Sequence, residues 1–308
     1  MEFGNEIENL VHLWQDGALN RRELVRLVAR HTGSAAKATA TLAAMGVLGA
    51  PERARAQCPA TVPEGAADIE ARMVEFPGEG GTIFAYLARP LGAPPPARTR
   101  ARGVAPQPGI LVIHENQGLT DHIKDVTRRV ARAGYVALGI DLLSRLGGTA
   151  QFTDAVARAQ AYNRVGAANY LPDMLSGVAY LKSLPIVQRD RLGAVGFCAG
   201  GGNCWNLAVT SPDILAPVVF YGSPPPPVEA LDRLSAVLCM YAELDRNLTA
   251  RMPPIISALV DKRKPFGFHI YQGANHAFHN DTGPQYNPVA ACDAWTKTIA
   301  FFDLRLRG

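Results

Sequence analysis

The sequence predicts an α/β fold in which helices cover both faces of a mostly parallel β-sheet. From residue 109 onward, short runs of consecutive apolar residues alternate with helical patterns. Continuous apolar runs are typical of strands buried on both faces, as parallel strands are. A glycine-rich turn at residues 196–201 lies between such a run and a helical pattern. The 308 residues, 48% of them hydrophobic, can bury a full core without disulfides or structural metal.

The predicted elements begin with a hairpin, since the strand-like runs 69–76 and 82–88 flank the turn signal Gly78-Glu79-Gly80-Gly81. Prolines at 94–96 and 106–108 then predict an extended surface connection. The buried strands expected after it are 109–114, 135–140, 192–196, 216–221, 237–241 and 268–271. The helices expected between and after them are 121–133, near 151–163, 167–184, 199–209, 250–263 and 288–303.

The chain divides into a helical N-terminal segment, 1–56, and a domain, 57–308. Arg21-Arg22, the apolar run 35–50 and Ala54-Arg55-Ala56 resemble a twin-arginine export signal, which would place the protein in the periplasm. The alternative is a cytoplasmic protein whose helical arm packs on the domain or on a second subunit of a homodimer. Two features favour the arm: Lys37 near the start of the apolar run, and the acidic residues Glu2, Glu6, Glu8 and Asp16.

Charge and hydropathy exclude two classes of partner. The net charge is +4, and three of the positive charges, Arg98, Arg100 and Arg102, lie in one proline-rich linker. The rest of the chain is nearly neutral, so we expect no basic face for nucleic acid. The sequence has no run of 18 apolar residues, so we expect no helix across a membrane.

Cysteine and histidine spacing predicts neither a disulfide framework nor a metal or other cofactor. The cysteine count is odd, and no pair has the CxxC spacing of a zinc site. His114, His276 and His279 match no metal-ligand motif. At least one thiol is therefore free among Cys58, Cys198, Cys204, Cys239 and Cys292.

Cys198 is the candidate nucleophile. It is the central residue of Gly196-Phe197-Cys198-Ala199-Gly200-Gly201, a G-x-C-x-G turn between a strand and a helix. This is the nucleophile elbow of the alpha/beta-hydrolase fold, with cysteine in place of serine. The N-terminus of the following helix favours a thiolate or an oxyanion at the turn. Cys204, Cys239 and Cys292 lie in apolar patterns that are typical of inert buried thiols.

A cysteine nucleophile needs a base and a group that orients the base. In this fold the order along the chain is nucleophile, acid, histidine. Asp245 follows one apolar strand, with Glu243 as its rival. His276 follows the next strand, with His279 and His269 as rivals. We expect His269 to be a structural residue within its strand, and His279 to line the pocket or cap the loop.

The loop after strand 109–114 carries His114-Glu115-Asn116-Gln117-Gly118. In such hydrolases this loop supplies one oxyanion-binding N–H, and the residue after the nucleophile supplies the other. Asn116 and Ala199 are therefore the predicted oxyanion hole. Glu115 is a candidate to take or hold the thiol proton, and the alternative is a salt bridge to a nearby arginine.

These residues resemble the dienelactone hydrolase family over about residues 69–308. The C-terminal motif His276-Ala277-Phe278-His279-Asn280-Asp281, with Tyr286 downstream, is similar to a bacterial branch that also carries an N-terminal helical arm. The other motifs that carry the resemblance are Tyr86-Leu87-Ala88-Arg89-Pro90, His114-Glu115-Asn116, Asp141-Leu142, Gly196-Phe197-Cys198 and Asp245.

The resemblance implies a triad of Cys198, His276 and Asp245. It also implies that Glu115 holds the thiol proton until substrate displaces it, and that the acyl-enzyme is opened by water with His276 as base. Arg145 matches one of two family arginines that bind the substrate carboxylate, whereas Asn280 stands in place of the other. Asparagine does not replace the charge of an arginine, so we expect a neutral or differently shaped ester.

The sequence therefore predicts a cysteine-dependent hydrolase of small carboxylic esters or lactones. One alternative is a non-catalytic binding or sensing relative on the same scaffold. The other is a peroxide-reactive thiol at Cys198, which requires a resolving cysteine. Cys204 lies six residues further on, roughly 9 Å along a helix axis, which is too far for a disulfide.

Overall fold

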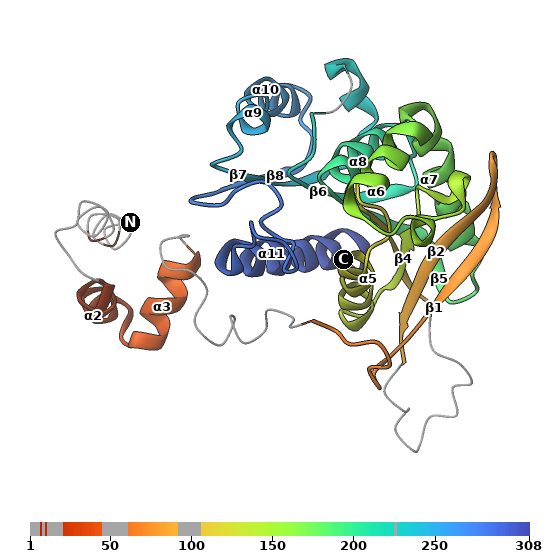
Figure 1. Ribbon diagram of the computed structural model, residues 1–308. Helices are drawn as coiled ribbons and strands as arrows, with labels where there is room; N and C mark the ends of the chain where they lie inside the picture. The colour runs from red at the N-terminus through yellow and green to blue at the C-terminus, as the bar shows by residue number, and fades with distance from the viewer. Residues whose placement is uncertain (1–6, 8–9, 11–20, 45–60, 92–105, 225–226) are drawn as a thin grey trace. The chain divides into compact units, whose positions relative to one another are not determined.

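The computed structural model describes residues 7, 10, 21–44, 61–91, 106–224 and 227–308 (Figure 1). The chain forms two compact units, Met1–Pro59 and Ala60–Gly308. Parts of several sequence predictions lie outside the described residues: the acidic residues before Arg21, residues 54–56, Cys58, and the linker with Arg98, Arg100 and Arg102.

The described part of the first unit is a pair of helices, α2 (Arg21–Thr32) and α3 (Ala35–Ala44). Leu24 and Val28 of α2 share a buried apolar cluster with Ala38 and Leu42 of α3. Of the helices described in the chain, none is both long and apolar enough to span a membrane. The function of this unit, as arm, subunit contact or export signal, stays a prediction.

In the second unit the described residues form one eight-stranded sheet in the order β1-β2-β4-β3-β5-β6-β7-β8. The predicted hairpin is confirmed, because β1 and β2 pair antiparallel around Gly78 and Gly81. β2 also pairs antiparallel with β4, and all later pairs are parallel. The strands are β1 (Ile69–Gly78), β2 (Gly81–Pro90), β3 (Gln107–Ile113), β4 (Val136–Ile140), β5 (Val187–Phe197), β6 (Ile214–Phe220), β7 (Val237–Ala242) and β8 (Phe266–Tyr271).

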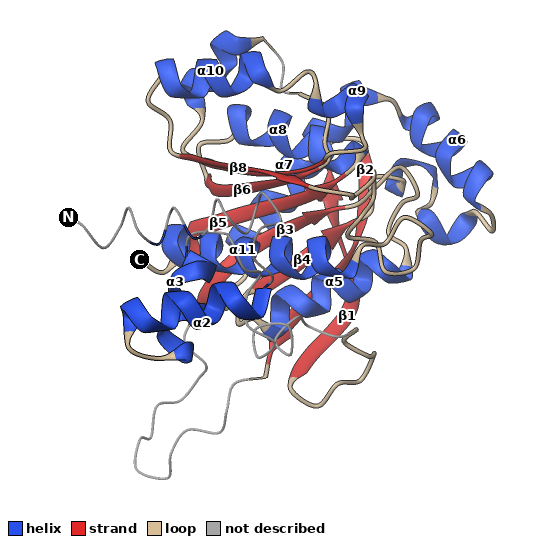
Figure 2. Cartoon of the chain, turned by 90° about the vertical axis from the view of Figure 1, so that its left-hand side faces the viewer, coloured by secondary structure: helices blue, strands red, loops and turns tan. Residues whose placement is uncertain are grey.

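Helices cover both faces of the sheet (Figure 2), as the sequence predicts. One face packs against α5 (Asp121–Arg132) and α11 (Pro288–Leu306). The other face packs against α6 (Ala155–Val165), α7 (Ala167–Ser183), α8 (Ala199–Thr210) and α10 (Pro253–Asp261). The chain is therefore an α/β protein with the layers of an alpha/beta-hydrolase.

Some element boundaries differ from the prediction for local reasons. Strand β5 begins at Val187 rather than 192, because four polar residues continue the strand beyond its apolar part. The helix expected near 151–163 begins at Ala155, where Asp154 accepts a hydrogen bond from the Ala157 N–H as its N-cap. The helix expected at 250–263 is α10, which begins at Pro253, and a separate short helix, α9 (Arg246–Thr249), precedes it.

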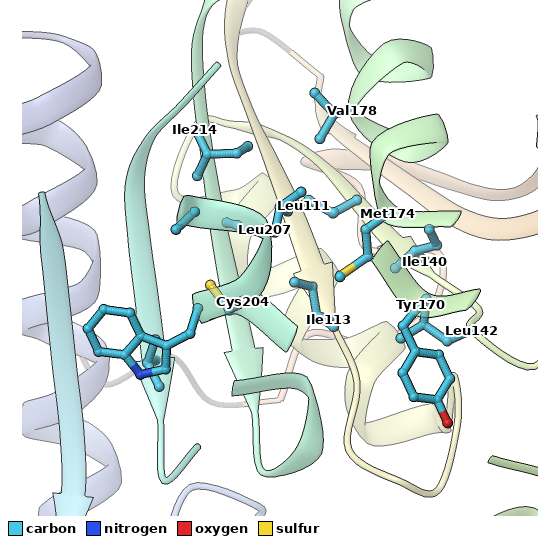
Figure 3. Close-up of a cluster of buried hydrophobic side chains, with 14 of the residues drawn as sticks. Leu111, Ile113, Ile140, Leu142, Tyr170, Met174, Val178, Cys204, Leu207 and Ile214 are labelled. Atoms are coloured by element: carbon cyan, nitrogen blue, oxygen red, sulfur yellow. The ribbon is translucent and has the colours of Figure 1, made fainter. Parts of the chain in front are cut away.

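The core on the α7–α8 face positions the candidate nucleophile. Leu111 and Ile113 of β3 lie against Met174 of α7 and Leu207 of α8 in one buried cluster (Figure 3). Because α8 begins directly after Cys198, this packing fixes the helix that follows the turn.

The loop after β4 is closed by Asp141, which is buried. Asp141 Oδ1 accepts hydrogen bonds from the Leu143 N–H at 3.0 Å and the Thr149 hydroxyl at 2.8 Å. Asp141 Oδ2 accepts from the Thr149 N–H at 2.7 Å. These bonds hold residues 142–149, which include Arg145, at the edge where the parallel strands end.

Candidate active site

Cys198 lies on a strained turn. Its φ is 55°, a left-handed conformation that residues other than glycine rarely adopt. Its N–H donates to the Phe220 carbonyl at 3.1 Å, which ties the turn to β6. The side chain is partly exposed at the first turn of the 12-residue helix α8. The positive end of the helix dipole therefore faces the thiol.

The surrounding glycines allow a close approach of main chains. A Cβ atom at Gly196 would lie 2.0 Å from the Gly200 carbonyl oxygen. A Cβ at Gly200 would lie 2.3 Å from the His114 carbonyl oxygen. The glycine pattern therefore brings α8 directly against the loop that follows β3.

The structure brings Cys198, His276 and Asp245 into one hydrogen-bonded chain. Cys198 Sγ lies 3.0 Å from His276 Nε2, and His276 Nδ1 lies 2.6 Å from Asp245 Oδ2. Burial opposes a charge on the imidazole, but the hydrogen bonds and charges of Cys198 and Asp245 raise the pKa of His276 to about 9. His276 is therefore mainly protonated at neutral pH.

The two rival residues do not take part in the hydrogen bonds that join Cys198, His276 and Asp245. Glu243 accepts a hydrogen bond from the Gly273 N–H at 2.8 Å, so its carboxylate closes a turn rather than facing His276. His269 lies within β8, where burial and the charge of Lys297 lower its pKa.

Glu115 is buried and contacts the loop after β8, which also carries His276. Its Oε2 accepts a hydrogen bond from Asn280 Nδ2 at 3.0 Å. Its Oε1 is buried and has no hydrogen-bond partner among the described residues. Within the part of the chain described, Glu115 forms no ion pair with an arginine, so the alternative of a salt bridge is not what the structure shows.

The two predicted oxyanion donors lie on either side of the close contact at Gly200. Ala199 is the first residue of α8, and Asn116 is exposed in the turn after β3. His114 holds that turn: its Nε2 accepts from the Leu142 N–H at 2.9 Å, and its Nδ1 contacts the Glu115 carbonyl. Burial lowers the pKa of His114, so it is neutral and donates through Nδ1.

Arg145 does not join the group around Cys198. Its guanidinium forms a two-pronged pair with Asp173 of α7, with Nε–Oδ2 at 2.9 Å and Nη2–Oδ1 at 2.8 Å. Asp173 is completely buried, and its carboxylate occupies the fork that a substrate carboxylate would use. The role of Arg145 in substrate binding stays a prediction.

His279 requires a correction. The sequence predicts that it lines the pocket, where it would contact substrate, or caps the loop; its side chain is 2% exposed, which contradicts a place on the pocket wall. It packs against Phe197, Phe220 and Trp295, with ring centroids 5.0–5.7 Å apart. The left-handed φ of 63° at Ala277 turns the chain here, so the next two side chains enter the core. Burial lowers the pKa of His279 well below its usual value.

Tyr221 is a site residue that the sequence reasoning missed. Its ring lies 5.0 Å from that of His276, and its φ of 37° is also left-handed. Burial raises the pKa of its hydroxyl, and the charges of Glu115 and Cys198 add to the effect. The signal was its place at the carboxyl end of a buried parallel strand, where sites gather in such sheets.

Two other observations bear on alternative chemistry. The described residues contain no group of three or more potential metal ligands. Burial raises the pKa of Cys204 to about 12 and that of Cys239 well above its usual value. Both are thus unreactive thiols, which leaves Cys198 without a resolving cysteine among them.

A hollow near the edge of the sheet is separate from the group around Cys198. It has a volume of about 650 Å³ and lies between β1, Tyr180 and residues 147–151. None of the predicted site residues lines it.

Comparison with known proteins identifies similar chains. A family model described as the dienelactone hydrolase family matches residues 97–306. A putative carboxymethylenebutenolidase from Methylorubrum extorquens is 32% identical over 91% of this chain and 96% of its own length. A probable 2-oxo-3-(5-oxofuran-2-ylidene)propanoate lactonase from Bradyrhizobium is 30% identical over 76% of this chain and 94% of its own.

A solved structure is also similar. The crystal structure of a putative dienelactone hydrolase from Klebsiella pneumoniae has a TM-score of 0.66 and 27% sequence identity. The match covers 76% of this chain and 98% of that one.

The close approach at the turn predicts a contrast between two adjacent glycines. A Cβ at Gly201 would lie 2.7 Å from the Phe220 carbonyl oxygen, whereas one at Gly202 would lie 3.5 Å from its nearest neighbour. We expect Gly201→Ala to lower the free energy of unfolding by about 1–3 kcal/mol. Gly202→Ala should be neutral or stabilise by up to about 1 kcal/mol, since alanine is the better helix former. Urea unfolding measures both, and equal effects would contradict the close packing.

Proposed function

The chain belongs to the dienelactone hydrolase family, and we propose that it hydrolyses small carboxylic esters or lactones with Cys198 as nucleophile. The observation that carries this proposal is the chain of contacts from Cys198 Sγ through His276 to Asp245 on a strained turn. A nucleophile, its base and the group that orients the base have the required geometry. The printed names of the curated relatives, carboxymethylenebutenolidase and lactonase, support a lactone or ester as substrate.

The proposed reaction begins with a thiolate. The thiol proton passes to Glu115, whose buried Oε1 has no hydrogen-bond partner in the described part of the chain. Cys198 Sγ attacks the substrate carbonyl carbon, and the carbonyl oxygen becomes an oxyanion. The backbone N–H groups of Asn116 and Ala199 are the proposed donors to it. When the C–O bond of the ester breaks, the alkoxide takes a proton from His276, and the acyl group remains on sulfur as a thioester.

Water then opens the thioester. Neutral His276 takes a proton from the water molecule as its oxygen attacks the thioester carbonyl. The C–S bond breaks, the carboxylic acid leaves, and the thiolate and protonated His276 are regenerated. Asp245 holds the imidazole orientation through both steps and stabilises its charged form. The overall change is ester and water to acid and alcohol, with no cofactor.

The charges around the site favour a neutral acyl group. Asn280 is uncharged and already donates to Glu115. Arg145 is paired with Asp173, so a substrate carboxylate would have to replace a buried partner. We propose a neutral ester or lactone as substrate in preference to a carboxylate-bearing dienelactone.

A binding or sensing relative is the alternative on the same scaffold. It would have no need of an acid–base chain at the elbow, and the contacts of His276 favour the hydrolase.

The function is tested with p-nitrophenyl acetate, a neutral ester, and with an anionic dienelactone. We expect wild type to cleave the neutral ester with the higher kcat/KM. Cys198→Ala removes the nucleophile and should lower kcat/KM by about 10³-fold or more. The matched control is Cys292→Ala, which removes a buried thiol on α11, outside the hydrogen-bonded chain of Cys198, and should retain activity.

Equal activity in wild type and Cys198→Ala would contradict the nucleophile. A dienelactone cleaved faster than the neutral ester would contradict the proposed selectivity. If neither compound is cleaved but a thiol reagent labels Cys198, the binding alternative is favoured.

The raised pKa of His276 predicts the pH dependence. Protonated His276 is needed to release the alcohol, so kcat/KM should fall as pH rises through about 9. The carboxylate of Asp245 favours the protonated form, so Asp245→Asn should move this fall to lower pH and reduce the maximal rate by about 10²- to 10⁴-fold.

The free energy of unfolding should also decrease as pH rises. The folded pKa of His276 lies above its unfolded value, so its contribution is complete below about pH 6.5 and is lost as pH rises through about 9. The activity prediction is measured as a pH profile of kcat/KM in wild type and in Asp245→Asn. An unshifted profile in Asp245→Asn would contradict the assignment of His276 and Asp245.

A further inference from the structure

A cluster of charged side chains lies on α5, outside the group around Cys198. The guanidinium of Arg129 bridges two carboxylates, Asp125 on its own helix and Asp281 from the loop that carries His276. His122 Nδ1 lies 3.0 Å from Asp281 Oδ1. Three of these four residues, Arg129, Asp125 and His122, are almost fully buried, so solvent does little to weaken their interaction.

Asp281 is held as a carboxylate in this cluster. The hydrogen bonds from His122 and Arg129 and the charge of Arg129 lower the pKa of Asp281 well below its usual range, although burial acts against them. The helix end of the cluster is fixed as well: Asp125 Oδ1 accepts from the Val62 N–H at 2.6 Å, and Arg128 Nε donates to the Val62 carbonyl at 2.6 Å. The loop is therefore fastened to a rigid part of the domain.

The residue before Asp281 reaches the candidate proton acceptor. Asn280 Oδ1 accepts from the Thr282 N–H at 3.0 Å and from the Thr282 hydroxyl at 2.7 Å. These two donors fix which end of the amide is oxygen, so the Nδ2 group faces Glu115 Oε2 at 3.0 Å. The side chains of three consecutive residues, 280 to 282, are thus each held by a specific partner.

We propose that Asp281 is a positioning residue for Glu115. The inference rests on the proposed function, in which Glu115 takes the thiol proton. The contact of Asp281 with α5 sets the path of residues 280–282, and this path sets the hydrogen bond from Asn280 to Glu115. Asp281 touches neither substrate nor the reacting atoms, and it acts through Asn280.

The part of the loop before Asp281 is held by other buried side chains. Asp281 is therefore not needed to hold the whole loop in place. Phe278 and His279 are buried in the aromatic cluster below His276. These side chains hold the part of the loop nearest to His276. Loss of the Asp281 contact should therefore disturb Glu115 more than the contact between His276 and Cys198.

The test is Asp281→Asn, which keeps the side-chain shape and removes the charge. We expect kcat for p-nitrophenyl acetate to fall by about 10- to 100-fold with little change in KM, because the proton acceptor is displaced rather than a binding contact. The matched control is Asp68→Asn. This variant breaks the two hydrogen bonds, 2.7 and 2.8 Å long, from Arg132 of the same helix to Asp68. Asp68 is the residue before β1 and does not belong to the His276 loop. We expect kcat within about 2-fold of wild type for this control.

A double-mutant cycle with Asn280→Ala tests the route of the effect. If Asp281 acts through Asn280, Asp281→Asn should have little further effect on kcat in the Asn280→Ala protein. Additive losses would overturn the proposal. It would also be overturned if Asp281→Asn lowered the melting temperature and left the kcat of the folded protein unchanged, because the role would then be structural alone.

A second readout needs no substrate. The rate at which iodoacetamide alkylates Cys198 depends on the thiolate fraction. We expect it to fall in Asp281→Asn and in Asn280→Ala, and to stay at the wild-type value in Asp68→Asn. If no ester is hydrolysed by wild type but this pattern holds, the proposed function fails and the positioning role stands. An alkylation rate unchanged by Asp281→Asn would contradict the positioning role whether or not the protein is a hydrolase.

Discussion

The left-handed backbone of Cys198 is the constraint on which the rest of the site depends. A non-glycine residue in this conformation costs on the order of 1–3 kcal/mol, so the surroundings must hold it. The support comes from β5 on one side, α8 on the other and a backbone hydrogen bond to β6. Gly196 and Gly200 let these segments meet at distances that no side chain permits. The thiol is thereby presented at a helix N-terminus and at the carboxyl edge of the sheet.

The order of the parallel strands places the residues that surround Cys198. Asp245 follows β7, His276 follows β8 and Glu115 follows β3, and all three loops leave the same edge of the sheet. Different interactions hold His276 and Glu115 in place. His276 is fixed by its hydrogen bond to Asp245 and by buried aromatic neighbours. Glu115 is fixed through Asn280 by a segment whose own anchor is ionic. A buried aromatic cluster and a buried ion cluster thus both hold the loop that carries His276, and the two meet where His122 lies against His279.

The fold and the contact of Cys198 with His276 and Asp245 could be predicted from residue order, because continuous apolar strands and the G-x-C-x-G turn have strong local causes. The partner of Arg145 could not, since Asp173 is one carboxylate in a helix whose buried face no local pattern identifies. The inward turn of His279 depends on the backbone at Ala277, and left-handed alanine has no sequence signal. The link from Asp281 to α5 joins residues 152 apart, a separation that only the three-dimensional structure reveals.

The central claim is that Cys198 becomes acylated and His276 assists its release, and the most direct measurement is to trap that intermediate. Wild-type protein is mixed with p-nitrophenyl acetate, quenched with acid before one turnover is complete, digested and analysed by peptide mass spectrometry. The account predicts one acetyl group per chain, carried by the peptide that contains Cys198 and absent in Cys198→Ala. Turnover that continues with no acyl group on Cys198, or with the group on another residue, would contradict it.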